Sequence, residues 1–134
     1  MEGEEGAMRK GRILIVEDDF FIAEGIRNTL AEAGYEVIGM AGDTESAEQL
    51  AIQQGADLAI VSMKLEADVD GVRTASYLQS QFGMGILITT GFNEAVVHQW
   101  VGNPTSWPFL RKPFSETELL TSVSACLAEL QREL

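Results

Sequence analysis

The sequence predicts an α/β fold: a five-stranded, doubly wound parallel sheet with helices on both of its faces. Short apolar runs alternate along the chain with amphipathic segments, an order typical of parallel strands joined by helices. Most of the apolar runs are continuous rather than alternating, which indicates strands buried on both faces. With 134 residues, of which 46% are hydrophobic, the chain is long enough to form one domain with a substantial core.

The first strand and the first helix follow a short polar segment. Residues 13–16 read Ile-Leu-Ile-Val, a β-branched and aliphatic run that favours a buried strand. Asp18 or Asp19 can cap the helix that follows, and Gly34 can end it. The apolar positions of this helix recur at helical spacing: Ile22, Ile26 and Leu30.

The next two strands lie on either side of a second helix. Residues 35–41 and 58–63 have the apolar character of strands. Between them, Asp43-Thr44 is a helix start and Gly55 is a helix end. The positions expected to face the core are Ala47, Leu50 and Ala51.

The second half of the chain continues the alternation. An acidic loop over residues 65–71 leads into a helix over residues 72–82, and a fourth strand follows at residues 85–90. Asn93 can cap a short helix that runs to Val101.

A fifth strand is expected at residues 107–111, before the last helix. Ser115 and Glu118 have the spacing of a capping box, in which each side chain bonds the other residue's backbone N–H. The last helix carries one apolar stripe: Leu119, Val123, Cys126, Leu127, Leu130 and Leu134.

Composition and charge exclude several classes of protein. The net charge is −12, from 21 acidic against 9 basic residues, which argues against direct binding to a nucleic-acid backbone. The single Cys126 excludes an internal disulfide framework and suits a reducing cytosol. No apolar run is long enough to span a bilayer, and no signal-peptide pattern is present. We therefore expect a cytoplasmic protein without membrane insertion, with a flexible tail at residues 1–11 and one domain at residues 12–134.

Polar residues follow four of the five predicted strands, at the point where each strand ends. Glu17 and Asp18 follow the first strand, and Ser62, Thr90 and Lys112 mark the ends of the third, fourth and fifth. In a doubly wound sheet the carboxyl ends of the strands form a crevice where the strand order reverses. Carboxylates, hydroxyls and an ammonium group in one crevice suit a phosphoryl group and a divalent metal.

At these residues the chain resembles the receiver domain of two-component response regulators, over residues 12–134. The intervals match as well: 44 residues from Asp18 to Ser62, 28 more to Thr90, and 22 more to Lys112. The resemblance implies a flavodoxin-like receiver fold. The sequence around Thr90 and Lys112 is also similar to that of a stand-alone receiver subgroup common in alphaproteobacteria. The matching stretches are residues 13–19 and 57–62, Asp70-Gly71, Thr90-Gly91-Phe92 and Lys112-Pro113-Phe114.

The resemblance implies a metal site and an acceptor position. Glu17 and Asp18 correspond to the acidic pair that binds Mg²⁺, and the backbone carbonyl of Lys64 would complete the ligand set. Ser62 stands where the family has its phosphoacceptor aspartate. With one carboxylate fewer, Mg²⁺ affinity is expected to be weakened, because the number of charged ligands sets it.

The resemblance also implies a switch. Thr90 corresponds to the hydroxyl that moves toward the phosphoryl group, and Phe109 to the switch aromatic. Lys112 corresponds to the lysine that pairs with the phosphoryl group, and the peptide bond before Pro113 is expected to be cis.

Serine lacks what makes aspartate a phosphoacceptor. A carboxylate is ionised at neutral pH and attacks phosphorus without a base, whereas a hydroxyl needs one. Two hypotheses for Ser62 follow and stay open: a natural pseudo-receiver that never accepts phosphate, or an engineered Asp→Ser variant of an active receiver. Retention of Glu17, Asp18, Thr90 and Lys112 favours the second.

The resemblance implies a non-enzymatic, single-domain response regulator that acts by protein–protein contact in a phosphorelay. A histidine kinase, a phosphotransfer protein or another receiver would be its partner, and a homodimer is compatible with the sequence. The expected contact face comprises the fourth helix, the fifth strand and the last helix. The alternative is a flavodoxin-like or nucleotide-binding enzyme, but the first strand lacks the glycine-rich turn that cradles phosphates.

Overall fold

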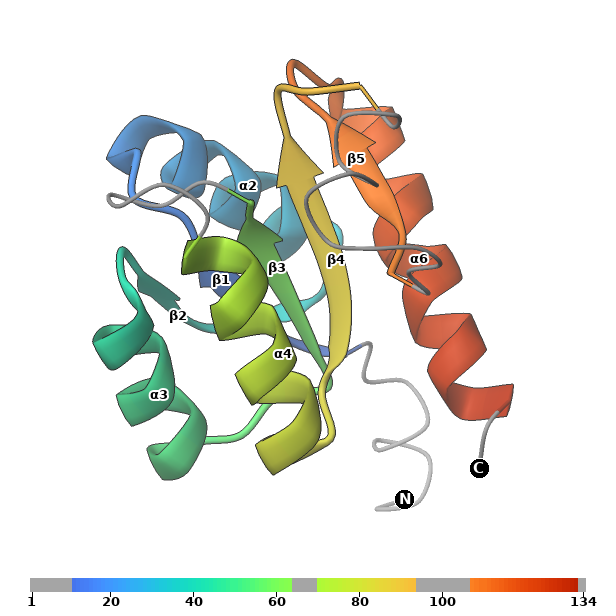
Figure 1. The fold of residues 1–134 in the computed structure, drawn as a ribbon. Helices are drawn as coiled ribbons and strands as arrows, with labels where there is room; N and C mark the ends of the chain where they lie inside the picture. Colours follow the sequence, from blue (N-terminus) through green and yellow to red (C-terminus); the bar gives the residue numbers. More distant parts are fainter. Residues whose placement is uncertain (1–10, 64–69, 94–106, 133–134) are drawn as a thin grey trace.

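The computed structural model describes residues 11–63, 70–93 and 107–132. Its five strands form one parallel sheet in the order β2-β1-β3-β4-β5 (Figure 1). This confirms the predicted five-stranded doubly wound sheet, with β1 and β3 adjacent where the strand order reverses. The strands are β1 (Arg12–Val16), β2 (Glu36–Ala41), β3 (Leu58–Ser62), β4 (Gly85–Thr90) and β5 (Phe109–Arg111). The helices are α2 (Phe20–Glu32), α3 (Thr44–Gln53), α4 (Asp70–Phe82) and α6 (Glu116–Arg132).

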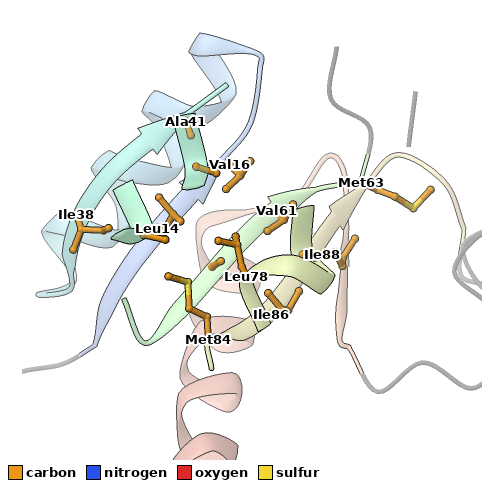
Figure 2. Close-up of a cluster of buried hydrophobic side chains, with 14 residues drawn as sticks. Leu14, Val16, Ile38, Ala41, Val61, Met63, Leu78, Met84, Ile86 and Ile88 are labelled. Carbon is orange, nitrogen blue, oxygen red and sulfur yellow. The ribbon is translucent and has the colours of Figure 1, made fainter. Parts of the chain in front are cut away.

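The core has two halves, one on each face of the sheet. On one face, α3 and α4 pack on strand residues that include Leu14, Val16 and Val61, as Figure 2 shows for Leu78 of α4. On the other face, α2 and α6 pack on the intervening strand residues. Successive side chains of a strand point to opposite faces, so the continuous apolar runs serve both layers.

The helix starts follow the predicted capping chemistry. Asp19, not Asp18, caps α2: its Oδ1 accepts hydrogen bonds from the backbone N–H groups of Phe21 (3.0 Å) and Ile22 (3.2 Å). At α6 the capping box is closed, since Glu118 N donates to Ser115 Oγ (3.0 Å) and Ser115 N donates to Glu118 Oε1 (2.8 Å).

Several boundaries differ from the sequence prediction by one or two residues, among them the start of α4 at Asp70 rather than at residue 72, and two of the differences have a clear physical cause. Gly11, assigned to the tail, is buried, and its carbonyl accepts a hydrogen bond from Glu36 N (3.1 Å), so it belongs to the packed domain. The fifth strand begins at Phe109 rather than at residue 107, because Pro108 has no N–H to donate to the ladder. Its carbonyl still accepts from Ile88 N at 3.0 Å.

The other predicted elements are found near their expected places. Gly34 ends α2 with a φ of 98°, a left-handed conformation that glycine adopts at little cost. The peptide bond between Lys112 and Pro113 is cis, as expected. The predicted helix from Asn93 to Val101 lies mostly outside the described residues. Among the described residues, no helix is long and apolar enough to cross a membrane.

Candidate functional site

A cavity of about 340 Å³ opens at the carboxyl ends of the central strands. The strand register explains why the predicted residues meet there. Val16 pairs with Val61, so Glu17 and Ser62 follow at the same level of the sheet. Ser62 in turn pairs with Thr89, and Thr90 pairs with Arg111. The cavity is lined by Glu17, Asp18, Asp19, Ile22, Ser62, Thr90, Gly91, Phe92 and Lys112.

Lys112 connects two of the predicted site residues. Its Nζ donates to Glu17 Oε1 at 2.8 Å and to Ser62 Oγ at 3.2 Å. Its backbone N–H donates to the carbonyl of Thr90 at 2.7 Å, which fixes the start of this side chain beside β4. The ammonium group therefore neutralises one carboxylate and contacts the serine hydroxyl at the same time.

Glu17 is buried, with only 5% of its surface exposed, so its negative charge requires partners. Lys112 supplies one, and the backbone N–H of Asp19 donates to Glu17 Oε2 at 3.1 Å. The backbone N–H of Glu17 donates to the carbonyl of Ala41 at 2.8 Å. Asp18, by contrast, is exposed at the mouth of the cavity.

Thr90 and Phe109, the predicted switch residues, occupy different environments. Thr90 is buried at the end of β4, and its Oγ1 accepts a hydrogen bond from Phe92 N at 3.0 Å. Phe109 is half-buried and packs against the core half that contains α3 and α4, and it is not among the residues that line the cavity. Lys64, the third predicted metal ligand, lies outside the described residues.

The donor atoms of the cavity fit a hard divalent cation. Mg²⁺ prefers oxygen ligands and is usually held by one or two carboxylates together with waters. Glu17 and Asp18 offer two carboxylates, although Glu17 already bonds Lys112. Within residues 11–63, 70–93 and 107–132, no group of three or more acidic, histidine or cysteine side chains is placed to hold a metal. Glu17 and Asp18 are therefore the described residues that would hold Mg²⁺ in this cavity.

Some residues that shape the site were not predicted as part of it. Asp19 was predicted only as a helix cap, yet its backbone N–H also holds Glu17. Gly71 was noted only as part of a matching stretch, yet it lies against the end of β3. The Asp19 contact leaves no signal in residue type, because it is made through the backbone N–H. Gly71 is signalled only by being a glycine, and the sequence alone does not show which close approach requires it.

A second, apolar cavity of about 540 Å³ adjoins the first. It lies between α2 and the start of α6, and Ile22 and Lys112 line both cavities. Phe21 at its edge is 85% exposed, and the neighbouring Phe20 is 61% exposed. Two adjacent exposed phenylalanines beside an apolar hollow are unusual on a free surface. The other lining residues are Gly25, Ile26, Thr29, Pro113, Phe114, Ser115, Glu116 and Leu119.

Comparisons with known proteins point to one family. The family model for the response regulator receiver domain matches residues 13–124. The transcriptional regulatory protein PdtaR of Mycobacterium tuberculosis is 30% identical over 120 residues, covering 90% of this chain and 58% of that protein. The uncharacterized transcriptional regulatory protein YrkP of Bacillus subtilis is 31% identical over 121 residues, covering 90% of this chain and 50% of that protein. The chain thus spans about half the length of the curated relatives that it matches.

Solved structures agree on the fold. The signal receiver domain of a modulated diguanylate cyclase from Desulfovibrio desulfuricans G20 superposes with a TM-score of 0.82 at 27% identity, covering 92% of this chain and 98% of that one. The receiver domain of PhyR from Erythrobacter litoralis has a TM-score of 0.81 at 22% identity, with 92% of this chain and 94% of that one covered.

Proposed function

Since the chain belongs to the response regulator receiver family, we propose that it is a receiver domain that acts by protein–protein contact in a two-component phosphorelay and forms no acyl phosphate at Ser62. It would serve as a cytoplasmic binding module rather than as an enzyme. One observation carries the proposal: the hydroxyl of Ser62, at the end of β3, is 3.2 Å from Lys112 Nζ inside the cavity, which supports assigning Ser62 to the acceptor position.

The surroundings of Ser62 do not favour attack on phosphorus. A serine nucleophile needs an adjacent base to remove its proton. Glu17 is the nearest buried carboxylate, and both of its oxygens already accept hydrogen bonds, from Lys112 and from the backbone of Asp19. Glu17 is therefore held by two donors, and a group that contacts the Ser62 hydroxyl at 3.2 Å, Lys112 Nζ, is an ammonium donor rather than a base. A bound Mg²⁺ would supply charge neutralisation for phosphoryl oxygens.

The partner surface is the apolar groove between α2 and the start of α6. Its lining is mainly aliphatic and aromatic and includes Glu116, and Asp18 and Asp19 line the adjoining cavity. With a net charge of −12, the chain would attract a partner with basic side chains. We propose that the occupant is an amphipathic helix, with apolar and basic faces, of a histidine kinase or phosphotransfer protein. The contact face expected from the sequence includes a helix outside the described residues and stays a prediction.

Phosphorylation with a small donor tests the proposal. The chain and its Ser62→Asp variant are each incubated with phosphoramidate and Mg²⁺, and their intact masses are measured. We expect no added phosphate on the present chain and one labile phosphate on Ser62→Asp, because only the variant has an ionised acceptor. Stoichiometric phosphate on Ser62 of the present chain, located by peptide mapping, would overturn the proposal.

The mass measurement is expected to give the same result whether Ser62 is the natural residue or replaces an aspartate. The genomic sequence distinguishes these two origins of Ser62. No feature of the described residues supports the alternative of a flavodoxin-like or nucleotide-binding enzyme.

A further inference from the structure

The first turn of α4 lies directly on the end of β3. Gly71, in this turn, is buried, and a Cβ atom built on it would lie 1.8 Å from the carbonyl oxygen of Ser62. The same atom would lie 2.7 Å from the carbonyl oxygen of Met63. A carbon atom needs roughly 3.3 Å from such an oxygen. The observed arrangement therefore has no room for any side chain at position 71.

This requirement differs from those of the other glycines. Gly71 is not among the glycines with positive φ, so the close approach, and not the backbone conformation, excludes a side chain. At Gly39 a Cβ would meet only the movable end of Leu50. At Gly25, within α2, it would meet nothing within 4 Å. At Gly71 the contact is between two backbones, and neither has a rotamer through which it could yield.

Helix α4 is held firmly on its other sides. Ala75 and Leu78 are fully buried against the sheet. The Oγ1 atoms of Thr74 and Thr44 are 2.6 Å apart, a hydrogen bond that ties the first turns of α4 and α3 together. The helix is therefore anchored on the sheet and on α3 independently of its contact at Gly71.

The peptide group between Ser62 and Met63 links this contact to the candidate site. Its carbonyl oxygen lies against Gly71, and its N–H donates to the carbonyl of Thr89 at 2.8 Å. On the other side of the Ser62 Cα is the hydroxyl, 3.2 Å from Lys112 Nζ. Moving this peptide group would therefore move the hydroxyl relative to the ammonium group.

We propose that Gly71 is a positioning residue for the candidate site: its missing side chain lets α4 lie on the end of β3 and so fixes where Ser62 meets Lys112. The inference rests on the proposed function in taking Ser62 as part of the working site.

The test compares amide NMR spectra of the full chain and Gly71→Ala, without any phosphate donor. We expect the amide resonances of Ser62, Met63 and Lys112 to shift. A variant that is only less stable would keep the parent chemical shifts at these residues in its folded molecules.

Two control variants separate position from stability. Thr74→Val removes a hydrogen bond of the same helix and should leave the Ser62 and Lys112 resonances in place. Gly39→Ala adds the same methyl group against the movable end of Leu50, outside the residues that line either cavity, and should do likewise. If Gly71→Ala shifts only α4 resonances, or if either control shifts Ser62 equally, the proposal is overturned.

A double variant covers the case in which Gly71→Ala does not fold. Adding Thr74→Val removes the hydrogen bond between Thr74 Oγ1 and Thr44 Oγ1, so the helix, and not Ser62, should yield to the new methyl group. Recovery of the fold with wild-type Ser62 shifts supports the proposal, and failure of the double variant to fold overturns it. Because phosphate is absent, these results are independent of the mass measurement that tests the proposed function.

Discussion

Lys112 and Glu17 form an ion pair of 2.8 Å inside the cavity, with one partner almost fully buried. The pair occupies an acidic side chain that a divalent cation would also use. Lysine and metal are therefore expected to compete for the same carboxylate.

Replacement of Lys112 tests this competition. In Lys112→Met, Glu17 keeps its bond from Asp19 N but loses its counter-charge, so the metal-free fold should lose about 1–3 kcal/mol. Mg²⁺ should bind more tightly than in the parent chain and restore part of the stability. Urea denaturation with and without Mg²⁺ measures both effects, with Lys112→Arg as the charge-preserving control. Unchanged or weaker Mg²⁺ binding in Lys112→Met would refute the competition.

Ser62→Asp tests the electrostatic consequence of the serine. A third carboxylate beside Glu17 and Asp18 adds repulsion that the single Lys112 cannot fully offset. The metal-free variant should melt at a lower temperature than the present chain, and Mg²⁺ should raise its melting temperature more. Ser62→Ala, which adds no charge, is the control. Equal or higher metal-free stability of Ser62→Asp would contradict the argument.

Gly25→Ala is expected to separate stability from docking. The new methyl group enters open space and replaces a glycine in a helix interior, so the fold should gain about 0.5–1 kcal/mol. The same methyl group enters the apolar groove, and binding of a partner helix there should weaken. Thermal melts and titration with a partner kinase or phosphotransfer protein measure the two effects. A gain in stability with unchanged binding would place the partner elsewhere on the molecule.

Cys126 is expected to be a slow thiol. Burial raises its pKa to about 11, because the charged thiolate is disfavoured among apolar neighbours. Below pH 9 its thiolate fraction should be on the order of 100-fold lower than that of an unburied cysteine. Reaction with a disulfide reagent at pH 8, compared with the chain unfolded in urea, measures this. Equal rates in the two states would show that the thiol is accessible.

The same pKa shift predicts a loss of stability at high pH. The folded-state pKa lies above the unfolded value, so the unfolded chain releases its proton first as pH rises. The contribution of the protonated Cys126 thiol to the free energy of unfolding is fully present below about pH 9. It is lost progressively as the pH approaches 11. Urea denaturation between these pH values should therefore show that the free energy of unfolding declines less in Cys126→Ala than in the parent chain.

The sequence predicted the layers and several residues that line the cavity, because both follow from periodicity and order along the chain. Continuous apolar runs such as residues 13–16 predicted buried strands, and the polar residue after each run predicted the crevice. The contacts of Gly71 and Asp19 could not be predicted, because they depend on the approach of backbones distant in sequence. The predicted start of the fifth strand at residue 107 was wrong. The apolar pattern does not take into account that Pro108 has no backbone N–H to donate.

Ile22 and Lys112 form a common wall between the acidic cavity and the apolar groove. A helix seated in the groove would touch the same lysine that holds Glu17. A cation that draws Glu17 away from that lysine would then change the affinity of the groove for the helix. By thermodynamic linkage, the helix would change the affinity for the cation by the same factor. The concentration of a divalent cation would then tune partner recruitment by this chain without any covalent modification.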